Sequence, residues 1–389
     1  YTITGLDNAT RYYFRVTAVN KQGYEGTSAA IDITPTYSGP VWWVSTTGSD
    51  SNEGSSGSPF KSLEHAIENV TAGDTVMLRK GTYTGSRNRG IEISSDDQDW
   101  NFDNYKNVVI TSEKGADSTI IDAEYKDRHF YIKGNNQKTI DSTFQFIGLT
   151  FTRGKSGESG GSFVLDGESN YVNGSYVVSL MQPKFKDCIF KDNQAIGGSN
   201  YSASGGAFYI EDGAPIFESC VFDSNYSNQR GGALSIGGNT SATRDTLWFR
   251  NCTFKNNWVD DSGQSQNNNH GSVSGGALNL EFGMNLVILN SVFENNYAEQ
   301  RNSNSGGSSG GALFIAGNWN PSGGNSSNIP TVWVINSRFT KNKVNHAFGG
   351  TNSHGGAIYV GAPFVMINTL VDSNAAEFHA DGGRGMGGG

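Results

Sequence analysis

The stretch that decides the fold reads Gly231-Gly232-Ala233-Leu234-Ser235-Ile236, followed by Cys252-Thr253-Phe254-Lys255-Asn256-Asn257. Both segments recur from residue 144 to the end of the chain. The first recurs as a Gly-Gly pair, a small residue and alternating apolar residues; the second recurs as Phe-x-x-Asn. The Gly-Gly pairs begin at Gly160, Gly205, Gly231, Gly275, Gly310 and Gly355. Period-2 alternation bounded by Gly and Asn predicts short strands with one buried face.

The Phe-x-x-Asn element keeps its columns although the segments between its copies vary in length. Its asparagines are Asn193, Asn225, Asn257, Asn296, Asn342 and Asn374. A unit of this kind cannot bury its apolar face alone, so the copies must stack. The repeats therefore predict an all-β parallel solenoid whose coils lie about 4.8 Å apart. We expect the asparagines to form a ladder in a turn, each carboxamide bonding the next and satisfying backbone groups.

The chain has three cysteines, Cys188, Cys220 and Cys252, separated by 32 residues each time (220 − 188 and 252 − 220). They occupy one column of the repeat, in which later coils have Ser or Thr. A column that accepts only small side chains predicts buried free thiols rather than a disulfide.

Composition favours a turn-rich extracellular protein. The 389 residues include 52 glycines, and only 17% are charged. The net charge of −9 argues against a nucleic-acid partner, because phosphate binding needs clustered Lys and Arg. It also weakens the hypothesis of a polyuronate substrate, because such a substrate would need a basic groove or bridging cations. No apolar run reaches the length of a membrane span, and no signal peptide is visible.

The first residues differ from the repeats. Residues 1–36 resemble the C-terminal part of a fibronectin type III domain, through Leu6-x-x-x-Thr10-x-Tyr12-x-Phe14-x-Val16-x-Ala18-x-Asn20 and a closing Thr34-Pro35. The resemblance implies a partial β-sandwich fragment, and Tyr12 would be its tyrosine corner. We expect residues 37–40 to be a linker, and both ends of the chain to be cut, the C-terminal end in the middle of a coil.

Residues 41–389 form the predicted solenoid, with 41–75 as its N-terminal cap. Apolar residues at Leu63, Ala66, Ile67 and Val70 predict a short capping helix. The run from Ser58-Pro59-Phe60 through Gly81-Thr82-Tyr83 resembles the start of right-handed parallel β-helix proteins of the pectin-lyase-like superfamily. The Gly-Gly and Phe-x-x-Asn repeats are similar to those of chlamydial polymorphic outer membrane proteins. That superfamily mixes lyases, hydrolases, adhesins and stalks, so the resemblance implies the fold and leaves the activity open.

Candidate ligand-binding residues follow the asparagine column. Tyr226, Trp258 and Tyr297 each come directly after a ladder asparagine, at the root of loops of variable length. Exposed aromatic rings stack on the apolar faces of sugars, so this column is a candidate glycan platform. The alternative is an aromatic ladder packed beneath the loops.

No cofactor is firmly predicted. Asp96, Asp97, Asp99 and Asp103 form the densest acidic group and make a Ca²⁺ site possible, although their spacing does not match an EF-hand. Charges next to the Phe-x-x-Asn element alternate in sign between coils, which is typical of salt bridges on a solvated face. The sequence shows no catalytic constellation and leaves open whether the chain is an enzyme.

The leading functional hypothesis is a secreted or cell-surface scaffold or adhesin, bacterial in type, whose loop edge contacts a polysaccharide or cell-surface glycan. The first alternative is an extracellular polysaccharide lyase or glycoside hydrolase with the same fold. The second is a filament subunit that self-associates through open solenoid ends.

Overall fold

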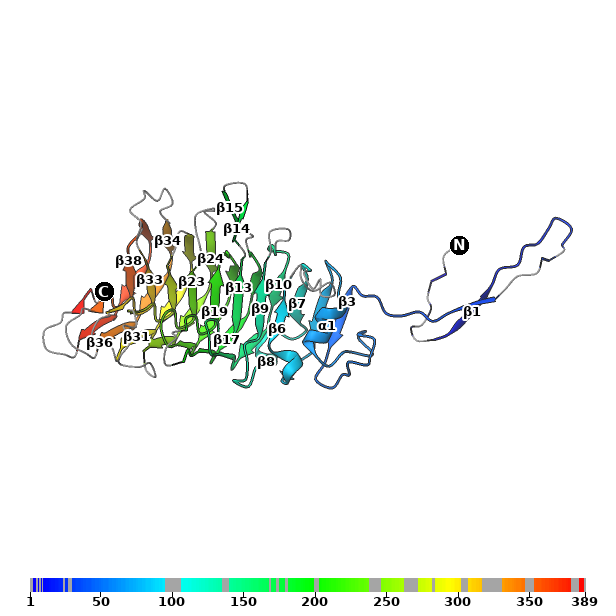
Figure 1. Cartoon of the computed structure of the whole chain (residues 1–389), viewed down its shortest axis with the longest axis horizontal. Helices are drawn as coiled ribbons and strands as arrows, with labels where there is room; N and C mark the ends of the chain where they lie inside the picture. The colour runs from blue at the N-terminus through cyan, green and yellow to red at the C-terminus, as the bar shows by residue number, and fades with distance from the viewer. Residues whose placement is uncertain are drawn as a thin grey trace.

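A computed structural model describes most of the chain. The described residues are 3–4, 6, 8, 10–23, 25–26, 30–94, 106–134, 140–167, 169–172, 175–178, 181–198, 203–237, 246–261, 272–281, 284–301, 307–316, 331–346, 353–378 and 385–387. Over these residues the chain forms a parallel β-solenoid, as the repeats predict (Figure 1).

Successive coils contribute strands to several parallel sheets that extend along the solenoid axis. Counted over the described residues, the largest is a ten-stranded sheet, and in every coil after the first its strand is followed by a strand of a nine-stranded sheet. The ten-stranded sheet contains β3 (Val41–Val44), β4 (Thr75–Leu78), β7 (Val109–Ser112), β10 (Gln145–Ile147), β16 (Lys184–Lys186), β20 (Ile216–Glu218), β24 (Thr246–Arg250), β29 (Asn285–Leu289), β34 (Val332–Ile335) and β39 (Phe364–Ile367). The nine-stranded sheet contains β5 (Gly81–Tyr83), β8 (Thr119–Asp122), β11 (Thr150–Thr152), β17 (Ile189–Lys191), β21 (Val221–Asp223), β25 (Thr253–Lys255), β30 (Val292–Glu294), β35 (Arg338–Thr340) and β40 (Leu370–Asp372).

Among the described residues, three further parallel sheets contribute strands to the coils. The seven-stranded sheet contains β12 (Lys155–Ser156), β18 (Gln194–Ala195), β22 (Tyr226–Ser227), β26 (Trp258–Asp260), β31 (Tyr297–Gln300), β36 (Lys343–His346) and β41 (Ala375–Phe378). The four-stranded sheet contains β27 (Val273–Ser274), β32 (Ser308–Ser309), β37 (Ser353–His354) and β42 (Gly385–Met386). The eight-stranded sheet contains β6 (Ile91–Ile93), β9 (Phe130–Lys133), β13 (Phe163–Asp166), β19 (Phe208–Glu211), β23 (Leu234–Gly237), β28 (Leu278–Leu280), β33 (Leu313–Ile315) and β38 (Ile358–Val360).

In the part of the chain that the structure describes, two antiparallel hairpins lie outside this pattern. β14 (Ser169–Val172) pairs with β15 (Ser175–Val178) and projects from the solenoid after β13 (Figure 1). β1 (Tyr12–Arg15) pairs with β2 (Ala30–Ile33) and stands apart from the solenoid. Several of its apolar side chains are open to solvent, including Tyr13 with 69% of its surface exposed.

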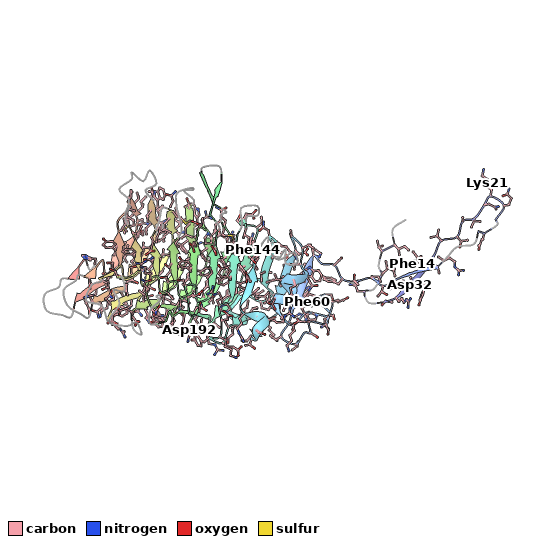
Figure 2. All side chains as sticks on the ribbon, in the orientation of Figure 1. Phe14, Lys21, Asp32, Phe60, Phe144 and Asp192 are labelled. Atoms are coloured by element: carbon pink, nitrogen blue, oxygen red, sulfur yellow. The ribbon has the colours of Figure 1, made fainter. Side chains whose placement is uncertain are left out.

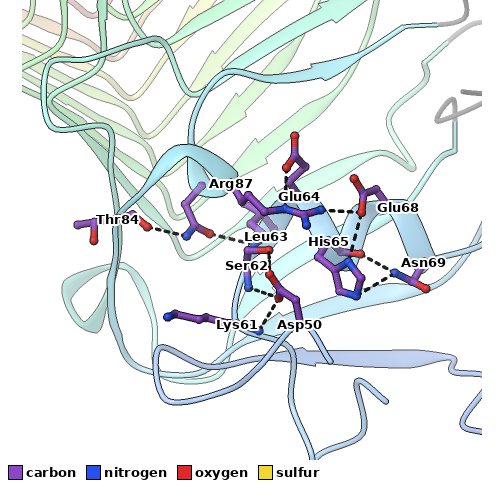
Figure 3. A network of polar contacts seen from close by, with 11 residues as sticks. Asp50, Lys61, Ser62, Leu63, Glu64, His65, Glu68, Asn69, Thr84 and Arg87 are labelled. Atoms are coloured by element: carbon purple, nitrogen blue, oxygen red, sulfur yellow. Dashed lines mark hydrogen bonds and ion pairs between the residues drawn. The ribbon is translucent and has the colours of Figure 1, made fainter. Parts of the chain in front are cut away.

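The N-terminal cap contains the predicted helix, α1 (Leu63–Asn69), with Leu63, Ala66 and Ile67 buried. Figure 3 shows how polar contacts hold it. Asp50 accepts hydrogen bonds from the backbone amide and hydroxyl of Ser62, at 2.9 and 2.7 Å. Although burial opposes the effect, these bonds hold the pKa of Asp50 below its usual value. Two short 3₁₀ turns follow, η1 (Ser86–Asn88) and η2 (Ala116–Ser118).

Phenylalanine columns fill the solenoid interior (Figure 2, where Phe144 is one buried example). Phe222, Phe254, Phe293 and Phe339 stack from coil to coil with ring centroids 4.5–4.6 Å apart and nearly parallel planes. A second column runs through Phe146, Phe185, Phe217 and Phe249, at 5.1 Å. In-register stacking puts like residues against like, so the core is continuous along the axis.

The asparagine column forms a buried ladder in the turn between the nine- and seven-stranded sheets. Each carboxamide donates to the carboxamide oxygen of the next coil, at 2.9–3.0 Å, from Asn193 to Asn374. Each also donates to the carbonyl of a phenylalanine in the preceding coil, as Asn257 does to Phe222 at 3.0 Å. The ladder therefore satisfies backbone groups that the turn would otherwise leave unpaired.

The cysteine column lies inside the turn between the ten- and nine-stranded sheets. Cys188, Cys220 and Cys252 are free and buried, and each thiol points at carbonyl oxygens 3.3–3.5 Å away. Burial and the neighbouring thiols raise the pKa of Cys220, so it is an inert structural thiol. Ser291 continues the column and accepts a hydrogen bond from the backbone amide of Cys252, at 3.1 Å.

Candidate functional site

The predicted aromatic column lies on the seven-stranded sheet. Tyr226, Trp258 and Tyr297 are register partners on β22, β26 and β31. The rings of Tyr226 and Trp258 stack with centroids 4.9 Å apart. Tyr226 has only 9% of its surface exposed, whereas Trp258 and Tyr297 are partly exposed. A ligand can therefore reach Trp258 and Tyr297, while Tyr226 mainly supports them.

Carboxylates lie two residues beyond two of the rings, Asp260 in β26 and Glu299 in β31, and Asn345 holds the equivalent position in β36. The Tyr226 hydroxyl donates to Asp260 at 2.8 Å. Asn345 donates to Glu299 at 2.8 Å and to the Tyr297 hydroxyl at 3.3 Å. Burial is the largest influence on Glu299 and opposes ionisation, but hydrogen bonds from Tyr297, Arg301 and Asn345 bring its pKa below the usual value. This group therefore keeps a negative charge beside the aromatic rings.

Cations balance part of that charge. Arg301 contacts Glu299 directly, and its guanidinium lies 3.6 Å from Asp260. Lys343, the next residue in the aromatic column, pairs with Glu377 at 2.6 Å and lies 5.9 Å from the Tyr297 ring centroid. The surface around the rings is thus polar and hydrogen-bonded, with both donors and acceptors.

A second constellation, which sequence reasoning missed, lies on the outer face of the eight-stranded sheet. We call it the carboxylate row: Asp166, Glu211 and Glu281, with the tyrosines Tyr131 and Tyr209. Asp166 of β13 and Glu211 of β19 are register partners on neighbouring strands. The Tyr131 hydroxyl donates to Asp166 at 2.6 Å. These contacts place two carboxyl groups side by side in different hydrogen-bonding environments.

Glycine makes room for the second tyrosine of the row. In β23 the position next to Glu211 is Gly237. A Cβ atom there would lie 3.2 Å from the Tyr209 hydroxyl, so the absence of a side chain lets that hydroxyl lie over the strand. The Tyr209 hydroxyl thus occupies the gap that Gly237 leaves within the row.

The carboxyl groups of the row shift one another's ionisation. Partial burial, together with the neighbouring Asp166, raises the pKa of Glu211. Burial first, and then the charges of Glu211, Glu281 and Asp166, raise the pKa of Tyr209 to about 12. A carboxyl whose pKa is raised, next to a second carboxyl, is the arrangement that general acid catalysis uses.

Two arginines border the carboxylate row. Arg230 forms an ion pair with Glu281. The guanidinium of Arg128 lies 5.5 Å from the Tyr131 ring centroid and donates to Ser156 at 2.7 Å. Among the described residues, neither arginine forms an ion pair with Asp166 or Glu211. In register, Asp166 lies between Lys133 of β9 and Glu211 of β19.

The calcium hypothesis falls on residues outside the described part of the chain, since Asp96, Asp97, Asp99 and Asp103 all belong to 95–105. Within the described ranges, His, Cys, Asp and Glu form no group of three or more that could hold a metal ion. The helices among these residues include none long and apolar enough to cross a membrane.

Comparison with known proteins gives a partial sequence match and structural alignments of low similarity. No family model matches the chain. It is 39% identical over 94 residues to the uncharacterized protein YwoF of Bacillus subtilis (strain 168), and the match covers 23% of this chain and 18% of that protein. Among solved structures, a rhamnogalacturonan lyase aligns with a TM-score of 0.39 and 17% identity, over 84% of this chain and 75% of the other. The pectate lyase Pel9A aligns with a TM-score of 0.36 and 15% identity, over 87% and 80%.

Proposed function

We propose that this chain is a secreted or cell-surface β-solenoid that acts as a scaffold or adhesin and binds glycans through Trp258 and Tyr297. The observation that carries the proposal is the placement of these two partly exposed rings on successive coils, beside the ionised Glu299. The proposal that the chain is secreted rests on its low proportion of charged residues and its many glycines. It also rests on the resemblance of residues 1–36 to part of a fibronectin type III domain.

The chemistry of the aromatic column suits a carbohydrate. Rings on neighbouring coils, about 4.8 Å apart, present a surface on which the apolar face of a sugar stacks. Asp260, Glu299 and Asn345 are buried beside the rings, and Asp260 and Asn345 hydrogen-bond to the hydroxyls of Tyr226 and Tyr297, which holds the rings in place. The preferred ligand is a neutral glycan, because the chain's charge of −9 repels polyanions.

Replacing Trp258 with alanine is expected to weaken glycan binding by about threefold to tenfold, the loss expected from one stacking contact. The measurement is retention on a panel of immobilised polysaccharides, with release of reducing ends and of unsaturated uronates scored in the same samples. Tyr297→Ala should give a similar loss. Trp43→Ala in β3 is the matched control and should bind like the original chain; equal binding by all three variants would reject the aromatic column as the ligand site.

A second candidate function, glycoside hydrolysis, is favoured by the raised pKa of Glu211 beside Asp166. Glu211 would donate a proton to the leaving oxygen, and Asp166 would attack the sugar or activate water. A lyase acting on polyuronates suits this face less well, because Asp166 and Glu211 form no ion pair with the bordering arginines and would repel an anionic substrate. The row therefore favours a neutral polysaccharide.

If the chain cleaves glycans, Glu211→Gln should lower the rate by about 10²–10⁴-fold, the usual contribution of a general acid, while leaving binding intact. The register spacing of about 4.8 Å is close to the roughly 5–5.5 Å of retaining glycosidases, so NMR of the first product should show retained anomeric configuration. Because the pKa of Glu211 is raised, activity should persist above the pH at which an ordinary glutamate ionises and decline at higher pH. Glu294→Gln, on β30, is the control and should not change the rate.

A further inference from the structure

The ten-stranded sheet has an apolar outer face towards the C-terminal coils. Its strands place Trp248, Val287 and Trp333 in one outward column, on β24, β29 and β34. The second outward column contains Leu289 and Ile335 at neighbouring positions. We call these five residues the tryptophan face. Except for Val287, which is 9% exposed between the two tryptophans, all are partly exposed.

This apolar surface is outside the solenoid core. The interior is filled by the alternate residues of the same strands. Examples are Phe249, Ile288 and Val334, which are fully buried. Folding therefore does not require tryptophan at positions 248 and 333, because the core is closed by the opposite side of each strand. An exposed apolar patch that the core does not need is typical of a binding surface.

The charges at the border of the tryptophan face neutralise each other. Arg250 follows Trp248 by two residues and lies 4.4 Å from its ring centroid. Its guanidinium pairs with Glu218 at 3.1 Å, and Glu218 also pairs with Lys184 at 2.7 Å. The face thus offers guanidinium donors near its edge without an unpaired charge, and this charge distribution matches a neutral partner better than an anionic one.

The two tryptophans lie two strands apart, at about 9.6 Å along the solenoid axis, twice the strand spacing. This distance is about the length of two sugar rings in an extended β-linked chain. The two tryptophan rings would contact every second sugar, and the shorter side chain of Val287 lies between them. This arrangement fits a ribbon-like polysaccharide whose flat face lies along the solenoid. Arg250, held by Glu218, is placed to donate to hydroxyl groups at the edge of such a ribbon.

We propose that the tryptophan face binds an extended, neutral, β-linked polysaccharide chain that runs parallel to the solenoid axis. The site is separate from the aromatic column and from the carboxylate row, which belong to the seven- and eight-stranded sheets. It does not depend on either proposed function.

The test is calorimetric titration with soluble neutral β-1,4-linked gluco-oligosaccharides of increasing length. It uses the full chain carrying Trp258→Ala, so that the aromatic column contributes little. Affinity should rise steeply once the oligosaccharide is long enough to cover both tryptophans. Trp248→Ala and Trp333→Ala should each remove that rise and lower the affinity for the longest oligosaccharide by about tenfold, which corresponds to about 1.4 kcal/mol. Trp333→Tyr should restore most of it, and Trp43→Ala should leave it unchanged.

Folding is checked by thermal unfolding of each variant, which should match that of the parent because the substitutions lie outside the core. Several results would overturn the proposal. One is affinity that does not depend on length; another is unchanged affinity in both tryptophan variants. A third is concentration-dependent association of the chain that Trp333→Ala abolishes in the absence of glycan binding, which would make the face a contact between copies.

Discussion

Replacing Gly232 with alanine is expected to destabilise the solenoid by more than about 4 kcal/mol, well above the usual cost of a point substitution. A Cβ atom at position 232 would lie 2.2 Å from the carbonyl oxygen of Gly276 in the next coil and 2.5 Å from that of Trp258. Both atoms belong to the backbone, so no side chain can move aside. The clash can be relieved only by separating coils that the hydrogen bond from Gly232 to Gly275, at 3.1 Å, holds together.

The first glycine of the same pair is required for a different reason. Gly231 has a φ of +60°, and a Cβ atom there would lie 1.9 Å from the carbonyl oxygen of Leu234. Gly231→Ala therefore adds backbone strain to a steric clash. The two variants should lose stability to a similar extent, although only position 231 combines the clash with left-handed backbone.

The measurement is the midpoint of urea unfolding, followed by circular dichroism at the strand minimum. Gly157→Ala is the matched control, because a Cβ atom at that position would meet nothing within 4 Å and its φ is not positive. It should change the unfolding free energy by no more than about 0.5 kcal/mol. If Gly232→Ala unfolded at the same urea concentration as this control, the close approach of the coils at Gly232 would not be what excludes a side chain there.

The repeat made the fold predictable because each side chain occurs in a column of similar side chains. Phe254 is predicted to face inward from its alternation alone, and it lies between Phe222 and Phe293. The capping helix was predictable from four apolar residues at helical spacing; three of them lie within Leu63–Asn69, and the fourth, Val70, caps its C-terminus. Because the pattern fixes both register and burial, the solenoid follows from local chemistry.

The candidate sites were only partly predictable. Spacing from the ladder asparagines located Trp258 and Tyr297, but not the burial of Tyr226, which depends on a neighbouring ring and on Asp260. Asp166 and Glu211 each lie six residues after the first glycine of a Gly-Gly pair. They directly follow the last apolar position of the repeat, so a repeat one residue longer includes the column that holds both carboxylates.

Ion pairs between coils, and the residues that share an outward face, can be identified only once the fold is known. The alternating charges near Phe-x-x-Asn do form ion pairs between coils, such as Lys255 with Asp223 at 3.3 Å. By contrast, Trp248 and Trp333 are 85 residues apart, and only the register of β24, β29 and β34 shows that they share a face. Sequence distance carries no information about such pairs when the connecting loops vary in length.

Replacing Asn257 with alanine should destabilise the chain by about 3–5 kcal/mol, because the substitution leaves buried polar groups without partners. The Asn257 carboxamide oxygen accepts from the backbone amide and the side chain of Asn225, at 3.1 and 2.9 Å. Its nitrogen donates to the carbonyl of Phe222 at 3.0 Å. Asn257 is fully buried, so water cannot replace these bonds without opening the turn.

Two further variants separate the hydrogen bonds from the volume of the side chain. Asn257→Leu is close in size to asparagine and has no polar atoms, so it should be about as destabilising as Asn257→Ala if hydrogen bonding is the cause. Asn374→Ala removes the last member of the ladder, which is only partly buried, and should cost less because water reaches the freed groups. Urea midpoints give all three values. Recovery of stability in Asn257→Leu would assign the loss to a cavity, and the ladder would then contribute packing rather than the hydrogen bonds that satisfy each turn.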